Sequence, residues 1–296
     1  MSISGSGNKI KSIHTRIGDY VIALGCLLIM LTCVLPLLHL GAQSLSSPMA
    51  IINARVAFLP VEFSTESYEF VFRDPAFSRS MVWTAILTVI YTLASLAMTV
   101  LCAYPLTYDG LKGKDGINTF IIFTMYFSAG TIPNYILMRD LGLLNNPLVL
   151  ILPGVLSVFN MIILRSFFYN VPISLRESAE LDGAHPFTVL VQIYLPLSLP
   201  VLATLALFYA VGRWNGFADA LLYLPDPTFH PIQMLLYNII NNLTSIDPGE
   251  IAGTAPQASE GMQAAAIMLA TIPIVLIYPW LQRYFISGVS LGAVKG

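Results

Sequence analysis

Glu177-Ser-Ala-Glu-Leu-Asp-Gly183 is followed, after nine intervening residues, by Ile193-Tyr-Leu-Pro196, and this stretch lies between two long apolar segments of the chain. Ser174 is the expected N-cap of a short helix, and Glu177, three residues later, completes a capping box. Gly183 ends that helix, because glycine readily adopts the left-handed conformation of a helix C-terminus. Pro186 then begins a second short helix. The stretch therefore predicts two short helices that meet at a glycine.

Such a turn has the shape of a docking element. Glu177 and Glu180 would face solvent, while Ala179 and Gly183 would keep the turn thin enough to enter a groove on another protein. An ordinary amphipathic connection between two apolar segments is the alternative interpretation.

The composition predicts an all-α membrane protein. Of its 296 residues, 56% are hydrophobic and 10% charged, and the mean hydropathy is +0.75, whereas ordinary soluble domains are roughly 25% charged. Six intervals without charge can each hold an apolar helix of about 20 residues, the length that crosses a bilayer. The predicted spans are 20–40, 80–106, 117–138, 147–169, 197–221 and 262–282. A β-barrel is excluded because its strands alternate in hydrophobicity over about ten residues.

The positive charges predict which ends face the cytoplasm, because Lys and Arg of short loops are retained there. The residues assigned to that side are Lys9, Lys11, Arg16, Lys112, Lys114, Arg165, Arg176, Arg283 and Lys295. Both termini are thus expected in the cytoplasm. The predicted organisation is a cytoplasmic lead (1–19), a first transmembrane helix (20–40), an extracytoplasmic segment (41–79), a five-helix core with the loop 172–196 (80–283) and a cytoplasmic tail (284–296).

The sequence contains no pattern typical of catalysis, a metal site or nucleic-acid binding. Cys26, Cys33 and Cys102 lie in apolar spans without a Cys-x-x-Cys pair, and the four histidines are scattered. The Gly/Lys turn at 110–115 lacks the spacing of a phosphate-binding loop. The net charge of −2 and the absence of a Lys/Arg-rich run argue against a nucleic-acid partner. We therefore expect no enzyme activity, no cofactor and no metal on this chain.

The spacing Glu-x-Ala, three residues, Gly, nine residues, Ile-x-Leu-Pro resembles the coupling-loop signature of ABC importer permeases. The resemblance extends over nearly the whole chain and is closest to carbohydrate permeases similar to the second membrane subunit of the maltose system. Trp214-Asn215, Leu222-Tyr-Leu-Pro225 and the tail from Arg283 also resemble that family, and the tail resembles its polysaccharide-fragment and aldouronate branch. One departure is Ser178, where the family has alanine.

The resemblance implies a type I ABC importer permease fold in a bacterial inner membrane. The implied partners are a second permease, two ATP-binding subunits that use ATP and Mg, an extracytoplasmic solute-binding protein and an oligosaccharide, with alginate or aldouronate fragments favoured. The residues expected to couple this chain to the ATPase are Glu177, Ser178, Ala179, Glu180, Asp182, Gly183, Ile193, Leu195 and Pro196.

Polar residues in the fifth span are candidates for the substrate path, because such residues are costly inside a membrane. Trp214 would stack on a sugar face, Asn215 would bond its hydroxyls, and Arg213 would pair with an acidic sugar. On one continuous helix, Arg213 and Asp219 project from different sides, whereas Asn215 and Asp219 lie together. The alternative is an interfacial Trp beside a snorkelling Arg.

A secondary transporter driven by an ion gradient is the alternative function. It would need an intramembrane carboxylate or a broken-helix ion site, commonly with internal repeats. Asp219, near the end of a span, is the single candidate carboxylate that the sequence offers.

Overall fold

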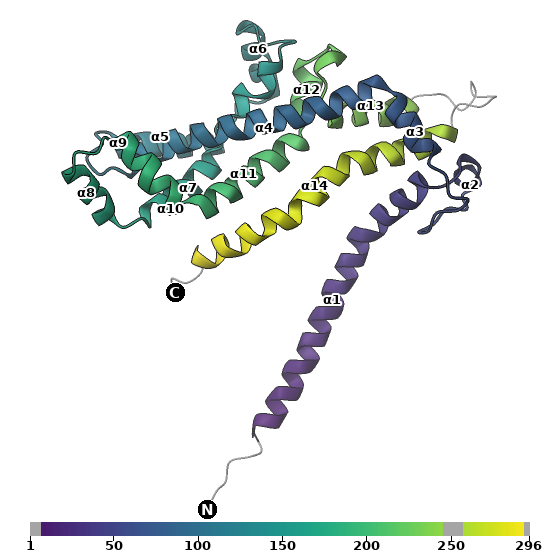
Figure 1. The fold of residues 1–296 in the computed structure, drawn as a ribbon, viewed down its shortest axis with the longest axis horizontal. Coiled ribbons are helices and arrows are strands. Elements are labelled where there is room, and N and C mark those ends of the chain that lie inside the picture. Colours follow the sequence, from purple (N-terminus) through teal and green to yellow (C-terminus); the bar gives the residue numbers. More distant parts are fainter. Residues whose placement is uncertain (1–6, 245–256, 293–296) are drawn as a thin grey trace, which may run out of the picture. The chain divides into compact units, whose positions relative to one another are not determined.

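The computed structural model describes residues 7–244 and 257–292, and these residues form helices and connecting turns (Figure 1). Parts of the predicted lead (1–6), of the connection between the fifth and sixth predicted spans (245–256) and of the predicted tail (293–296) lie outside the described residues. The chain divides into two compact units. One comprises the residues up to Arg73 together with Asn242–Leu269, and the other comprises Asp74–Asn241 together with the residues from Ala270 onward.

The first unit combines the helices near the N-terminus with part of the last helix that the structure describes. Its helices are α1 (Gly7–Ser44), α2 (Pro48–Ile52), α3 (Glu66–Arg73) and the first part of α14 (Gln257–Gly292). Gly261 of α14 allows close packing, since a Cβ there would lie 2.6 Å from the Ser67 hydroxyl and 3.1 Å from the Ile51 side chain. This contact fixes the start of α14 against α2 and α3.

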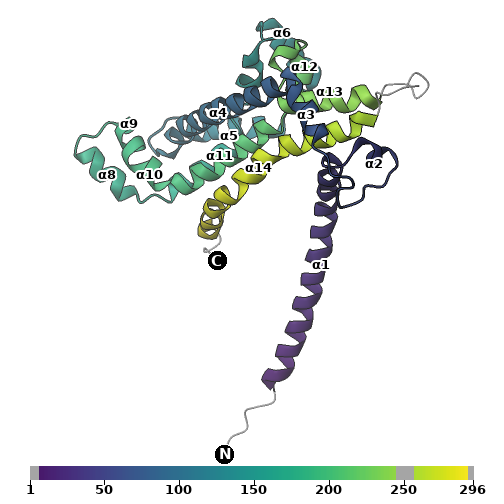
Figure 2. The same ribbon diagram turned by 45° about the vertical axis from the view of Figure 1, so that its right-hand side comes forward.

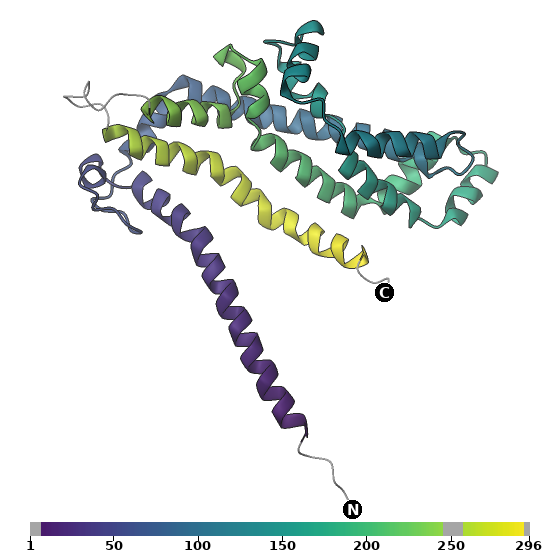
Figure 3. The ribbon, with the colours of Figure 1, turned by 180° about the vertical axis from the view of Figure 1, so that it is seen from behind.

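The second unit is built around α4 (Pro75–Ala103). Asp74 is the N-cap of this helix, and its carboxylate accepts a hydrogen bond from the Ala76 N–H. α4 packs on α11 (Leu199–Trp214) and α7 (Val158–Tyr169), and α8, α9 and α10 gather at one end of the α4–α11 pair (Figures 1 and 3). The remaining elements are η1 (Pro105–Thr107), α5 (Lys114–Tyr126), α6 (Thr131–Asp140), η2 (Pro147–Leu150), η3 (Leu152–Gly154), α8 (Ile173–Leu181), α9 (Pro186–Val189), η4 (Leu190–Tyr194), α10 (Leu195–Leu197), α12 (Ala218–Tyr223), η5 (Pro227–Phe229) and α13 (Ile232–Thr244).

Six membrane spans fit the described residues if three bent helix pairs each count as one. The continuous spans are Gly18–Ser44, Pro75–Thr107 and Glu260–Ile277. The other three are broken, between α5 and α6 (113°), between η2–η3 and α7 (48°), and between α9–α10 and α11 (83°). The predicted number of spans agrees with this count, whereas their predicted continuity was wrong for three.

The fifth span differs most from its prediction. The sequence predicts one helix over 197–221, but α11 ends at Trp214 and α12 begins at Ala218. Asn215 is the C-cap of α11, and the Gly216 N–H bonds back to the Arg213 carbonyl at 3.1 Å. Hydrophobicity alone does not place this break, because apolar runs lie beyond Arg213 on one side and beyond Asp219 on the other.

Candidate functional site

The turn between α7 and α11 has the predicted two-helix form, with a different start. The N-cap of α8 is Pro172 without a side-chain cap, so Ser174 lies inside the helix and the predicted capping box was wrong. A proline at this position limits the backbone on its own, because its ring fixes φ and it has no N–H to satisfy.

The end of α8 agrees with the prediction. Gly183 has φ of +81°, and its N–H donates to the Glu180 carbonyl at 3.1 Å, while the Ala184 N–H donates to the Ala179 carbonyl at 2.9 Å. This pair of bonds is a Schellman motif, which requires a left-handed residue after the helix. α9 then begins at Pro186, with His185 as its N-cap. We call α8, α9 and Gly183 between them the knuckle.

The knuckle exposes both acidic and apolar side chains. Glu177, Glu180 and Asp182 are exposed, as are Ser178 and Gly183. Leu181 is 89% exposed. Ile173 and Phe187 are 51% and 61% exposed as well, and a group of exposed apolar side chains beside carboxylates suits contact with a partner protein.

Beneath the knuckle lies a cluster of aromatic rings from three elements. The ring centroid of Tyr104 in the α4–η1 corner lies 5.1 Å from that of Tyr194 and 6.3 Å from that of Phe168 in α7. Tyr194 and Phe168 are themselves 5.4 Å apart. The Tyr104 hydroxyl donates to the Pro186 carbonyl at 3.0 Å. These contacts join α9 to α4 and α7.

Arg176 holds α8 to the same cluster. Its guanidinium lies 4.6 Å from the centroid of the Tyr108 ring, and its Nε is 3.7 Å from the Glu180 carboxylate. Close by in sequence, the Lys114 ammonium donates to Asp109 at 2.8 Å, and this hydrogen bond lowers the pKa of the Asp109 carboxyl. Arg176 and Lys114 are thus each paired with a carboxylate of the same chain.

The second half of the predicted motif has a packing position. Ile193 lies in the π-helical turn η4, and Leu195 begins α10. Both are half-buried against the core that contains Leu190 and Val201, whereas Pro196 is exposed. A π-turn inside a helical segment is a feature that often accompanies functional sites.

The four residues predicted for the substrate path lie on both sides of the break after α11. Arg213 is buried, and both its terminal nitrogens bond to the Asp219 carboxylate; Nη1 also donates to the Leu150 carbonyl at 2.9 Å. The expectation that Arg213 and Asp219 diverge was therefore wrong, because the chain turns at Gly216 and brings α12 back toward the end of α11. Asn215 is exposed, and its amide donates to the Val211 carbonyl at 2.9 Å.

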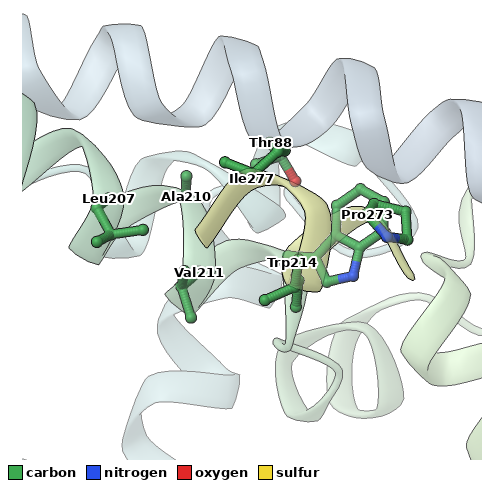
Figure 4. Close-up of a pocket in the computed structure, with 8 residues that line it drawn as sticks. Thr88, Leu207, Ala210, Val211, Trp214, Pro273 and Ile277 are labelled. Carbon is green, nitrogen blue, oxygen red and sulfur yellow. The ribbon is translucent and has the colours of Figure 1, made fainter. Parts of the chain in front are cut away.

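Trp214 is buried in a packing position. Its indole N–H donates to the Ala270 carbonyl of α14 at 3.1 Å. Its ring borders an apolar cavity of about 60 Å³ with Thr88, Val211, Pro273 and neighbouring residues (Figure 4). In this conformation the ring face contacts protein side chains, and sugar stacking at Trp214 stays a prediction.

The break between α5 and α6 was not predicted from the sequence. Residues 127–130 belong to no helix, and Gly130 has φ of +91°. Tyr126 and Phe127 are 76% and 66% exposed, and the Phe127 ring stacks on Phe123 at 4.1 Å. Ser128-Ala-Gly-Thr-Ile-Pro133 is the signal that marks this break, since glycine and proline within a helical pattern indicate an interruption.

Among the residues that the structure describes, no group of three or more His, Cys, Asp or Glu side chains could hold a metal ion.

Comparison with known proteins identifies the family. Residues 73–291 match the family described as "Binding-protein-dependent transport system inner membrane component". The chain is 38% identical over 283 residues (95% of this chain, 99% of the relative) to the polygalacturonan/rhamnogalacturonan transport system permease protein YtcP of Bacillus subtilis. It is 40% identical over 265 residues (89% and 90%) to Protein LplC of the same organism.

A solved structure agrees with this assignment. A chain of a bacterial ABC transporter involved in the import of the acidic polysaccharide alginate matches with a TM-score of 0.85 and 32% identity, over 96% of this chain and 100% of that chain. The fold is thus that of an ABC importer permease. The chain belongs to the family of inner-membrane components of binding-protein-dependent transport systems, and it is a permease subunit of an ABC importer.

Proposed function

We propose that this chain forms half of the pore of an importer for acidic oligosaccharides. A second, similar permease would form the other half, two ATPase subunits would bind below and use ATP and Mg, and an extracytoplasmic binding protein would deliver the sugar. Both chain termini would lie in the cytoplasm, on the same side as the knuckle.

The observation that carries the proposal is the knuckle on its aromatic base. A coupling element has to be exposed at its tip and stiff at its root. The tip exposes Leu181 and Glu177, and the root joins α9 to α4 and α7 through Tyr104, Tyr194 and Phe168. Closure of an ATPase pair on the tip would therefore move two membrane helices together, a rigid-body transition.

The broken span α5–α6 supports a place for the substrate path. α5 has 13 residues and is about 20 Å long, shorter than a hydrocarbon core of roughly 30 Å. With Lys114, at the start of α5, placed at the membrane boundary, residues 127–130 would lie within the membrane. Non-helical backbone at that depth is tolerated where it is buried in protein or lines a water-filled cavity. Tyr126 and Phe127, both exposed, supply aromatic faces for sugar rings, and Ser128 supplies a hydroxyl.

Arg213, Trp214, Asn215 and Asp219 would form the neighbouring wall of this path. Asn215 is exposed and suits a sugar hydroxyl. Arg213 is held by Asp219 and the Leu150 carbonyl, so an acidic sugar would meet the Arg213–Asp219 pair and compete with Asp219 for the guanidinium. Trp214 would fix the wall against α14 through its bond to Ala270.

The acidic class of substrate is inferred from the relatives. One relative is named for polygalacturonan and rhamnogalacturonan, and the matching solved structure belongs to an alginate importer. Both are acidic polysaccharides. The family membership itself favours a binding-protein-dependent system over an ion-driven secondary transporter.

The first test is gentle purification of this chain from its native membrane, with mass spectrometry of what accompanies it. A second permease and two copies of an ATPase are expected, with ATP hydrolysis stimulated more by oligogalacturonate or oligoalginate with binding protein than by a neutral oligosaccharide of the same length. Recovery of the chain alone, with uptake into liposomes driven by an ion gradient, would refute the importer.

The substrate class has a separate test in the double variant Arg213→Gln with Asp219→Asn, which removes both charges and leaves no unpaired ion. We expect uptake of acidic oligosaccharides to fall more than uptake of neutral ones. Equal losses would assign the pair a structural role and would leave the importer assignment intact.

A further inference from the structure

The loop after α2 folds back along α1 (Figure 2). Ser46 and Phe63 form an antiparallel bridge, and the Val61 N–H donates to the Ser46 hydroxyl at 3.0 Å. Further along α1, His39 Nδ1 lies 2.6 Å from the Ala57 carbonyl oxygen. Because His39 lies five residues before the end of α1 at Ser44, the loop descends by about 8 Å along the helix.

The loop is held in this position by polar and apolar contacts. Arg55 forms an ion pair with Glu62, and the Ser47 hydroxyl donates to the same carboxylate at 2.7 Å. Val56 is buried in a cluster with Ala42 of α1. His39 and Ala42, which lie on one face of α1, thus both contact the loop.

The part of the loop next to His39 is apolar and exposed. Phe58 is 52% exposed and Leu59 is 77% exposed, and Pro60 is also exposed. We call residues 58–60 the apolar tip. The tip carries no charge, whereas the ion pair Arg55–Glu62 lies at the neck of the loop. An exposed apolar patch with a polar margin marks a surface that contacts a partner or a membrane.

The position of the apolar tip along α1 indicates that the tip contacts the membrane. α1 contains the span Gly18–Ser44, and Asp19 is the last charged residue at its start. About 20 helical residues cross the hydrocarbon core, so the far boundary lies near residue 40. His39 and the Phe58 ring, whose centroids are 6.5 Å apart, therefore lie at that boundary, where an aromatic and an aliphatic side chain are stable.

We propose that the apolar tip inserts into the lipid leaflet at the Ser44 end of α1 and anchors this end of the helix at the membrane surface. The proposed partner of the apolar tip is therefore lipid. The inserted side chains would fix the height of α1 in the bilayer, while the Arg55–Glu62 pair would stay at the level of the head groups.

The test is a depth measurement with nitroxide labels in the complete transporter, reconstituted in phosphatidylcholine nanodiscs. Cys26, Cys33 and Cys102 are first replaced by Ala, and Leu59→Cys is labelled. Asn53→Cys, at the exposed C-cap of α2, serves as the matched control. Collision of each label with O2, which concentrates in lipid, is compared with collision with a water-soluble nickel chelate.

We expect the ratio of O2 to nickel collisions at Leu59→Cys to exceed that at Asn53→Cys, and Pro60→Cys to give the same result if the first variant assembles poorly. A ratio at or below the control value would place the tip in water and overturn the proposal. Loss of both kinds of collision would place the tip against a protein subunit, and loss of both on addition of the binding protein would make it a docking site for that protein.

Discussion

Replacement of Gly183 tests two requirements of the knuckle separately: the left-handed backbone at this residue and the absence of a side chain there. Gly183 has φ of +81°, and a Cβ built there meets no atom within 4 Å in the part of the chain that the structure describes. Gly183→Ala therefore adds no clash inside the chain, and its cost is the left-handed backbone, about 1 to 2 kcal/mol for an L-residue. That cost lowers the population of the observed turn by a factor of about 5 to 30.

Gly183→Asn is the matched control, because asparagine tolerates the left-handed conformation while adding a larger side chain than alanine. If the backbone turn is what the ATPase requires, Gly183→Ala is the more harmful change. If clearance at the tip is what matters, Gly183→Asn is more harmful, and Gly183→Trp is the most harmful of the three. Each variant is reconstituted in proteoliposomes with its partner subunits, and ATP hydrolysis and sugar uptake are measured side by side.

We expect Gly183→Ala and Gly183→Trp to insert at normal levels and to lower uptake per ATP hydrolysed. Normal uptake and normal ATP hydrolysis in both variants would refute the assignment of the knuckle as the coupling element. A failure of the chain to reach the membrane would be detected by the amount of purified subunit, which distinguishes misfolding from uncoupling.

Three further changes test the contacts around the site. Asp219→Ala leaves the buried Arg213 without its partner, which costs about 3 kcal/mol and should lower the melting temperature of the purified subunit, whereas Asp219→Asn, which keeps hydrogen-bond acceptors, should lower it less; equal melting temperatures would contradict this. Tyr104→Phe removes the hydroxyl bond to the start of α9, worth about 1 kcal/mol, and should lower uptake per ATP hydrolysed; an unchanged ratio would show that ring packing alone transmits the movement. The Asp109 carboxyl has a lowered pKa in the folded chain because Lys114 donates to it, so its stabilising contribution is present above the ordinary carboxyl pKa and is lost as pH falls through the folded pKa. The difference in melting temperature between the native chain and Asp109→Asn should therefore vanish on acidification. A difference that persists at low pH would contradict the pairing.

Local sequence patterns predicted the knuckle well because its shape depends on short-range chemistry. Gly183 ends α8 and Pro186 starts α9, and both effects act through the backbone of the residue itself. Ser174 was misplaced because Pro172 had already started the helix. A side-chain cap and a proline two residues away can each start a helix, and the sequence pattern does not decide between them.

The broken spans show where hydrophobicity is insufficient. The residues on both sides of 127–130 are apolar, so that span looks continuous by composition, but the chain bends by 113° between α5 and α6. The bends depend on contacts with other helices. Arg213 is one example, because its pairing with Asp219 and with the Leu150 carbonyl joins residues that lie 6 and 63 positions away.

The sequence by itself determined that this chain is an all-helical membrane protein with an exposed glycine turn between its fourth and fifth spans, because apolar length and turn chemistry are local properties. The tertiary structure decided which side chains are buried or paired and which are exposed. It buried Trp214 against Ala270, closed Arg213 onto Asp219, and left Asn215, Tyr126 and Leu59 exposed. Burial and pairing arise when distant segments pack together, and no pattern within one segment contains that information.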